Sequence, residues 1–267
     1  MFAESKSISK AGVIDALDEP PISDPSSLVD NIWHEIDARS IVAGKDYPFG
    51  LQQNSLAKKK TWKQAFNYSF MLLLSGHSFV RELRIRQWKV PSKLFERLTE
   101  TALTNYVGRA IGIGSPRVTP VPRSFERCLQ LVCENIKEPV RLDPPTTPDV
   151  KDDKVDIVAW KPIDDRMGKI VLLANCAAGE DWHGKTTDIS EGLWSAYIDS
   201  PFRPIRTFAF PYVGLDARVW RRTSLEGGLV LDRLRLVRLA PSHNKLPFRR
   251  DLIDWCNKMI IRLPWVE

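Results

Sequence analysis

Cysteine and histidine are scarce in this chain of 267 residues. The four cysteines stand at positions 128, 133, 176 and 256, no two of them form a CxxC pair, and the four histidines are scattered. Zinc sites and Cys–His nucleophiles need clustered side chains, so this pattern argues against both, including a pairing of Cys176 with His183. The N-terminus is acidic and polar rather than a targeting peptide, and we therefore expect reduced thiols and a cytoplasmic location.

Long apolar runs and a nucleotide-binding P-loop are also absent from the sequence. No apolar run is longer than that of residues 70–74, whereas a membrane-spanning helix needs about 20 apolar residues, so we expect no membrane partner. The stretch GIGSPR at residues 112–117 lacks the GxxxxGK[ST] pattern. Its residues Gly112, Gly114 and Arg117 are nevertheless suited to a loop that contacts a nucleic-acid backbone.

Charge of both signs is abundant. The chain has 39 basic and 33 acidic residues, a net charge of +6 and a pI near 9.1. This balance favours a polyanionic partner only if the basic residues are concentrated on one surface, because the acidic residues otherwise cancel their field. With 43% hydrophobic residues, the chain can bury the core of one large domain, with or without an appendage.

Hydrophobic periodicity predicts helices first and a mixed core after them. We expect an N-terminal helical region over residues 1–90 and a nuclease-like core over residues 91–267. The predicted helices cover residues 28–42, 61–76, 91–107, 124–136, 190–198 and 250–263. The predicted strands cover residues 155–160, 169–177, 205–213 and 227–240, the last with a bulge at Asp232. This order predicts an α+β or α/β fold with a central mixed β-sheet flanked by helices.

The hairpin within residues 152–185 carries polar side chains that a buried strand seldom contains. Asp156 lies in VDIVAW, whose two faces are both mostly apolar, so we expect this strand at the centre of the sheet. A carboxylate there is costly unless it is paired or binds a cation. By strand alternation Asn175 lies opposite Asp156, and a carboxylate, an amide oxygen and a backbone carbonyl such as that of Cys176 suit Mg²⁺. Lys185, beyond the second strand, is placed to orient a water or to stabilise a phosphate.

These residues resemble a known nuclease pattern. The segments KLFERLTETAL, DDKVDIVAW and KIVLLANCAAGEDWHGK are similar to the core of the PD-(D/E)XK superfamily, which has the restriction-endonuclease-like fold. The resemblance covers about residues 92–236 and departs from the family where NCA replaces Glu-x-Lys on the second strand. It implies that Glu96, Asp156 and Asn175 hold Mg²⁺ or Mn²⁺ and that Lys185 assists catalysis. It also implies a bacterial defence nuclease or a subunit of a multi-protein defence system.

Structural interpretations of the same residues stay open. Asp156 could form an ion pair with Arg233, and Asn175 could close a turn. Glu96 could lie on an ordinary helix surface, and Lys185 could belong to a solvated loop. Each of these interpretations places the residue in the fold without any catalytic role.

Basic segments suggest a nucleic-acid surface. The segments RELRIRQWK, SPRVTPVPR and VWRR bring arginine together with tryptophan, and such surfaces bind phosphates and stack on bases. We therefore expect nucleic acid, with DNA favoured over RNA, to bind at Arg84, Arg86, Lys89, Arg117 and Arg123. Arginine and the nine tryptophans suit a protein interface equally well, which would fit partner subunits.

Two functions follow from these features. The first is a metal-dependent nuclease, most simply a DNA endonuclease or the nuclease subunit of an anti-phage defence system. The alternative is a catalytically inactive protein of the nuclease fold that binds DNA or acts as a scaffold in a complex, which the altered second-strand motif supports. A partner-binding adaptor without a nucleic-acid role is a third interpretation, supported only by the tryptophan content.

Overall fold

The structure is a computed structural model that describes residues 7–16, 24–77, 80, 83–143, 150–214 and 216–263. The chain divides into two units, one of residues 1–84 and 249–267 and the other of residues 85–248. The first division lies close to the predicted boundary at residue 90. The C-terminal helix, predicted to close the nuclease-like core, belongs instead to the unit that contains the N-terminus.

The first unit combines helices with a small sheet. Strands β1 (Ser7–Ser9), β3 (Ser55–Lys58) and β2 (Phe49–Gln52) form an antiparallel sheet in that order. The helical elements of this unit are α1 (Lys10–Ala16), α2 (Pro25–Ala43), η1 (Gly44–Asp46), α3 (Phe66–Gly76) and α9 (Arg249–Ile260). The prediction of a helical region is therefore incomplete, because strands of three or four residues are too short to show a hydrophobic period.

Helix α9 belongs to the first unit because it packs against α3. The rings of Phe70 and Trp255 meet edge to face there, with their centroids 5.3 Å apart. Helix α3 is buried over most of its length, so it needs a partner along its side. The sequence shows that both helices are amphipathic or apolar but not that they meet.

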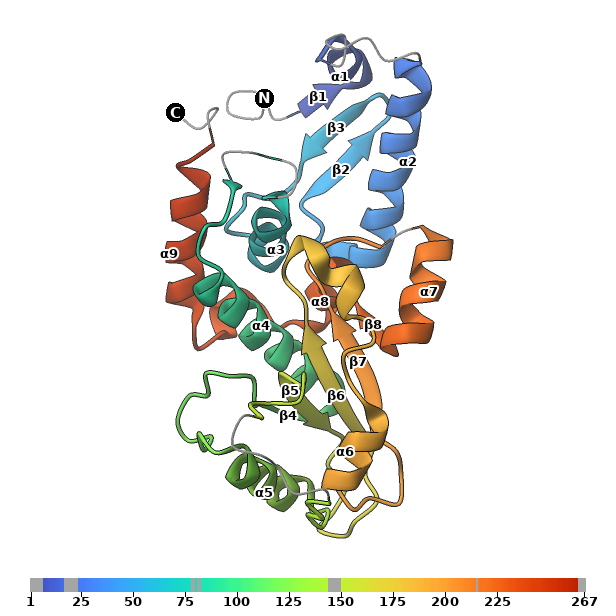
Figure 1. The fold of residues 1–267 in the computed structure, drawn as a ribbon. Coiled ribbons are helices and arrows are strands. Elements are labelled where there is room, and N and C mark those ends of the chain that lie inside the picture. Colours follow the sequence, from blue (N-terminus) through green and yellow to red (C-terminus); the bar gives the residue numbers. More distant parts are fainter. Residues whose placement is uncertain are drawn as a thin grey trace. The chain divides into compact units, whose positions relative to one another are not determined.

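The second unit is built around a five-stranded mixed sheet in the order β4-β5-β6-β7-β8 (Figure 1). Its strands are β4 (Arg109–Gly112), β5 (Ile157–Trp160), β6 (Val171–Cys176), β7 (Ile205–Ala209) and β8 (Leu229–Leu231). The pairs β4–β5 and β5–β6 are antiparallel, whereas β6–β7 and β7–β8 are parallel. The predicted central hairpin is confirmed, and all four residues of β5 are buried, as a strand covered on both faces requires.

Helices flank this sheet, as the predicted α+β class requires. They are α4 (Lys89–Val107), α5 (Phe125–Ile136), α6 (Glu191–Tyr197), α7 (Ala217–Gly227) and α8 (Arg233–Leu239), with the short helices η3 (Glu180–Lys185) and η4 (His243–Lys245). Helix α4 packs against β4, β5 and β6, with α8 beside it. Helices α5 and α6 pack on the other face, over Val158 and Leu173. In the described part of the chain, no helix has both the length and the apolar character to cross a membrane.

Residues 227–240, predicted as one strand, form a strand followed by a helix. Strand β8 ends at Leu231, and Asp232 then begins α8 by accepting the backbone N–H of Arg235 at 2.9 Å. Aspartate is a strong N-cap residue, so the change of phase interpreted as a bulge at Asp232 is a helix start. The alternation of leucine and arginine after it spans only two helical turns, too few to distinguish the two periods.

Gly228 joins α7 to β8 in a conformation that only glycine adopts readily. Its φ is +79°, and a Cβ there would lie 2.2 Å from the carbonyl oxygen of Arg206 on β7. We expect Gly228→Ala to lower the free energy of unfolding by about 1–3 kcal/mol or more, measured by chemical denaturation. Gly192→Ala is the matched control, since a Cβ at this position of α6 meets nothing within 4 Å. Equal stabilities of the two variants would contradict the geometry.

Candidate functional site

Two carboxylates from distant parts of the sequence converge beside Gly114. Glu96 projects from α4, and Asp156 stands directly before β5. A Cβ on Gly114 would lie 2.6 Å from Asp156 Oδ1 and 3.0 Å from Glu96 Oε2. Both carboxylates therefore border the same small volume, which the absence of a side chain at Gly114 keeps open. The structure thus brings together two of the four residues predicted to be catalytic.

The backbone around Asp156 is irregular, and this irregularity directs its side chain. The N–H of Asp156 donates to the carbonyl of Ala174 at 2.8 Å. Its own carbonyl accepts two N–H groups, from Ile113 at 2.7 Å and from Gly114 at 2.9 Å, which a regular ladder does not provide. The carboxylate lies toward α4, where Oδ2 accepts the backbone N–H of Cys176 at 2.8 Å.

Lys93, which is not among the residues predicted from the sequence, places its ammonium beside Glu96. Its Nζ forms an ion pair with Glu96 Oε2 and donates to the carbonyl of Gly114 at 2.8 Å. Residues three apart on a helix lie on one face, so α4 presents both charges together. The K-x-x-E spacing in KLFE is the signal in the sequence that identifies it.

Burial raises the pKa of both carboxyl groups. For Glu96, burial is the largest cause, the Lys93 ammonium opposes it, and the charges of Asp152 and Glu100 add to it. For Asp156, burial and then the charge of Glu96 raise the pKa to about 8, against the lowering effect of the Cys176 N–H. Each carboxylate raises the cost of ionising the other, so the pair favours a retained proton or added positive charge such as that of Lys93.

Asn175, predicted to face Asp156, lies on the opposite face of the sheet. The next residue, Cys176, has its side chain on the side of the carboxylates and of Thr99 on α4, and burial and then the charges of Asp156 and Glu96 raise the pKa of its thiol. Successive residues of a strand point to opposite faces, and the Asn175 amide lies 3.5 Å from Asp188 Oδ2. The alternation argument is wrong here because the irregular backbone before β5 turns Asp156 out of the regular pattern.

Lys185 and Arg233 have partners of their own. Lys185 forms an ion pair with Asp181 at 3.0 Å, four residues earlier in η3. The buried Arg233, considered as a partner for Asp156, donates its Nε to the carbonyl of Pro211 at 2.8 Å. The lysine whose charge acts on both Glu96 and Asp156 is Lys93.

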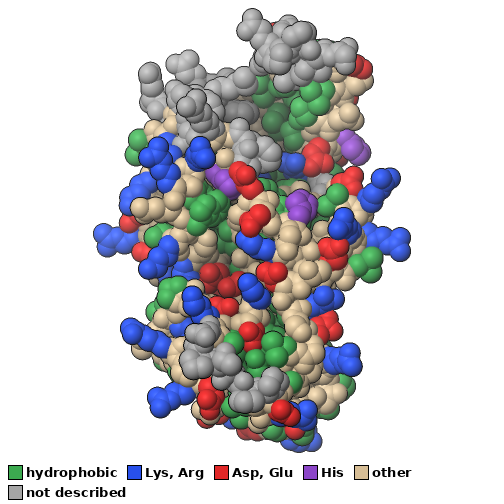
Figure 2. All heavy atoms as spheres, in the orientation of Figure 1, with side chains coloured by type: hydrophobic (Ala, Val, Ile, Leu, Met, Phe, Trp, Pro, Cys, Tyr) green, Lys and Arg blue, Asp and Glu red, His purple; other side chains and the backbone are tan. Residues whose placement is uncertain are grey.

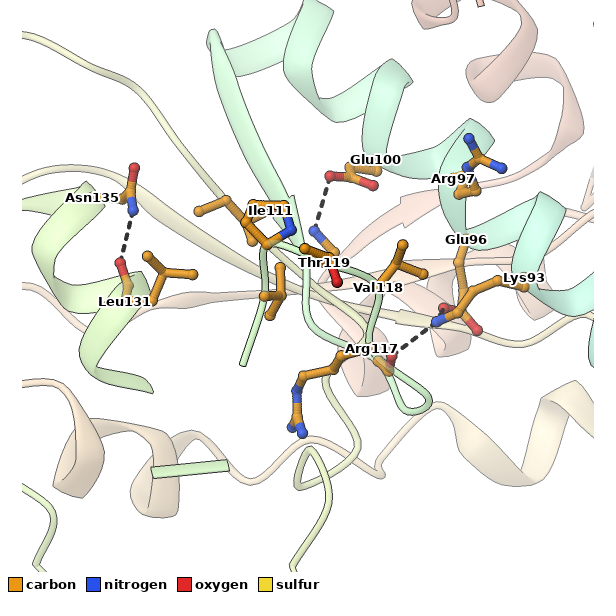
Figure 3. A pocket seen from close by; sticks show the side chains of 14 residues that line it. Lys93, Glu96, Arg97, Glu100, Ile111, Arg117, Val118, Thr119, Leu131 and Asn135 are labelled. Atoms are coloured by element: carbon orange, nitrogen blue, oxygen red, sulfur yellow. Dashed lines mark hydrogen bonds and ion pairs between the residues drawn. The ribbon is translucent and has the colours of Figure 1, made fainter. Parts of the chain in front are cut away.

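A pocket of about 510 Å³ opens beside the carboxylates (Figure 3). Helix α4 supplies its charged wall with Lys93, Glu96 and Glu100, whereas Ile111 and Leu131 stand across from them (Figure 3). Glu100 also joins the wall to the sheet, since its Oε1 accepts the N–H of Gly112 at 2.9 Å. A substrate at the carboxylates would therefore extend into a defined cavity rather than over a flat surface.

Arg117, predicted to bind nucleic acid, is held by its own loop and by the segment before β5. Its guanidinium donates to the carbonyl of Arg123 at 2.7 Å and to that of Lys151. It also lies over the ring of Phe125, 5.6 Å from the centroid. These contacts position the loop after β4 and engage the guanidinium that was expected to meet phosphate.

The other predicted basic residues, Arg84, Arg86, Lys89 and Arg123, are exposed. Arg84 belongs to the first unit, and the other three to the unit that holds the carboxylates. Lys89 precedes Lys93 by four residues on α4, so the two lie on the same helix face. Over the face drawn in Figure 2, basic side chains are interspersed with acidic ones instead of forming one stripe. On this face, a field that attracts phosphate would have to be local.

Comparisons with known proteins do not assign the chain to a family. No family model matches it, and neither a curated protein nor a solved structure shows significant similarity to it. The functional argument therefore depends on the geometry and electrostatics of the carboxylate pair.

The raised pKa of Asp156 predicts that stability falls as the pH rises from about 4 to about 8. In this window the folded chain holds a proton that the unfolded chain, with an aspartate pKa of 3.8, has released. Asp156→Asn removes this titration and should flatten the profile. At pH 8 the variant should be more stable than the wild type by about 1 kcal/mol or more.

Denaturant unfolding at pH 5 and pH 8 measures this difference. Asp165→Asn is the matched control, because it makes the same change at an exposed position. Parallel profiles for the wild type and Asp156→Asn would show that the carboxyl is already ionised at neutral pH.

Proposed function

We propose that this chain is a divalent-metal-dependent phosphodiesterase that cleaves nucleic acid and has the restriction-endonuclease-like fold. The observation that carries the proposal is the convergence of Glu96 and Asp156 beside Lys93 at the edge of a pocket. Buried carboxylates with raised pKa values and a specific charged partner are typical of functional sites. The order of α4, β4, β5 and β6, with Asp156 directly before β5, agrees with the resemblance to the PD-(D/E)XK superfamily.

The residues of the site fit Mg²⁺ or Mn²⁺. Carboxylate oxygens are hard ligands, and Mg²⁺ is commonly held by one or two carboxylates together with waters and substrate phosphate. Within the described ranges, no group of three or more His, Cys, Asp or Glu side chains could hold a metal ion. If an ion binds, Glu96 and Asp156 would be its carboxylate ligands, because both border Gly114.

The groups around the two carboxylates would orient Asp156 and balance charge on the phosphate. A bound divalent ion supplies Lewis acidity at the phosphate and lowers the pKa of a water. The Cys176 N–H holds the orientation of Asp156. The Lys93 ammonium, fixed between Glu96 and the Gly114 carbonyl, is placed to balance charge that develops on the phosphate. Lys93 thus takes the role that the resemblance gives to Lys185.

A catalytically inactive nuclease-fold protein that binds DNA or serves as a scaffold is the second candidate. The observation that favours it lies at the end of β6, where Asn175-Cys176-Ala177 stands in place of the Glu-x-Lys of the family pattern and the Asn175 amide lies near Asp188 instead of Asp156. A protein of this kind would bind nucleic acid, alone or with partner subunits, and would not cut it. The resemblance places either form in a bacterial defence system.

Two lysine variants test the assignment of the catalytic charge. We expect Lys93→Met to reduce Mg²⁺-dependent cleavage of plasmid DNA by roughly 10²–10³, the effect of losing one electrostatic stabiliser. Lys185→Met is the matched control and should keep near wild-type rates, since its ammonium is paired with Asp181. Glu96→Gln and Asp156→Asn should abolish cleavage and leave DNA binding nearly intact.

The assay uses plasmid DNA and RNA as substrates, each in the presence of Mg²⁺, Mn²⁺ or EDTA. Loss of activity in Lys185→Met, with Lys93→Met still active, would return the role to Lys185. A wild-type protein that cuts neither nucleic acid in either metal would leave the inactive scaffold as the better account.

Salt dependence tests the nucleic-acid surface near the start of α4. Arg86 and Lys89 are exposed, and Lys89 shares a helix face with Lys93. Replacing both with glutamine should reduce the slope of log affinity against log salt by about 1 for each phosphate that the variant no longer neutralises. Arg166→Gln is the control, because this exposed arginine is paired with Asp164. An unchanged slope, measured by fluorescence anisotropy of a labelled oligonucleotide, would exclude this surface.

A further inference from the structure

The pocket beside the carboxylate pair has two chemically different ends (Figure 3). Glu96 and Lys93 of α4 form one end. The rest of its lining is mixed. Its aliphatic end consists of Ile111 from β4, Val118 from the following loop and Leu131 from α5, and Arg97, Glu100 and Arg117 also line the pocket. The proposed cleavage requires a phosphate beside Glu96 and Lys93, but it does not by itself explain the aliphatic side chains that line the same cavity.

The dimensions of the cavity suit one nucleoside. A volume of about 510 Å³ lies within the range of roughly 300–1,000 Å³ that is usual for small-molecule pockets. A phosphate held at Glu96 and Asp156 is bonded on each side to the sugar of a nucleoside, so one nucleoside must lie within a few ångströms of the pair. Aliphatic side chains can pack on the face of a base, as apolar side chains do in enzymes that take a base out of its stack.

We propose that this pocket binds the unstacked nucleoside adjacent to the scissile phosphate and that the chain therefore acts on single-stranded nucleic acid. This inference rests on the proposed phosphodiesterase function. A base that is paired and stacked within a duplex cannot enter a cavity, so duplex nucleic acid would first have to unpair there at a cost of a few kcal/mol. Single strands do not bear that cost. Thr119 and Asn135 add polar groups to the lining that can meet a base edge.

Filling the aliphatic end tests the inference by binding. The probes are a labelled single-stranded oligodeoxyadenylate and a hairpin duplex of equal length, with Ca²⁺ in place of Mg²⁺ to slow cleavage. The wild type should bind the single strand at least about tenfold more tightly. Leu131→Trp and Val118→Trp should both lose this preference, because an indole would occupy the space of the base. Val118 is 67% exposed, so its substitution keeps the test valid if Leu131→Trp fails to fold.

Leu225→Trp is the matched control, since Leu225 lies on α7, outside the pocket lining, and is 70% exposed. It should keep the preference for the single strand. A hairpin bound as tightly as the single strand, or a preference that survives both pocket variants, would overturn the inference.

The cleavage assay separates failure of this inference from failure of the proposed function. A single-strand preference that depends on the pocket, in a protein that cuts nothing, would overturn the phosphodiesterase proposal and support the pocket. Mg²⁺-dependent cleavage of duplex and single strand at equal rates, unaffected by Val118→Trp, would overturn the pocket and support the phosphodiesterase proposal.

Discussion

The repulsion between Glu96 and Asp156 is the constraint on which the rest of the site depends. Burial favours the neutral form of a carboxyl group, and a second carboxylate nearby adds to the cost of ionising it. The surroundings compensate in part, through the Cys176 N–H on Asp156 and the Lys93 ammonium on Glu96. Folding does not require this arrangement, since apolar side chains could fill the same volume without an electrostatic cost. The proposed phosphodiesterase function would explain why the chain carries it, with the proposed divalent cation as its partner.

The local fold makes this juxtaposition possible at one point of the sheet. Asp156 leaves the regular ladder just before β5, and its carbonyl receives the N–H groups of both Ile113 and Gly114. The loop after β4 is thereby held against the start of β5, with Gly114 beside the two carboxylates. A side chain at position 114 would collide with both carboxylates. Gly114 therefore has two effects: its N–H fixes the loop to Asp156, and its lack of a side chain leaves room for the two carboxylates.

Local signals in the sequence were sufficient for the central elements but not for the full site. The turn between β5 and β6 and the glycine that ends α4 at Gly108 are specified by neighbouring residues, so the hairpin and this helix could be predicted. Glu96 and Asp156 were found by residue type and resemblance. Asn175 was misplaced because alternation assumes a regular strand, and the irregular backbone before β5 depends on contacts with the loop after β4, which no local pattern reveals. The packing of α9 on α3 likewise depends on contacts across the whole chain.

Most of the charged side chains around this site come from helix α4, whereas the PD-(D/E)XK pattern carries its Glu-x-Lys on a strand. Lys93, Glu96 and Glu100 are spaced by three and four residues, so they follow one face of the helix. Lys93 donates to the carbonyl of Gly114, Glu96 borders the same glycine as Asp156, and Glu100 accepts the N–H of Gly112. That last bond joins the helix to β4 one turn beyond the site. In a motif carried by two paired strands, the ladder itself fixes the distance between the ligands. Here the two carboxylates come from a helix and from the residue before a strand, and a bond such as that of Glu100 helps to hold these two elements together.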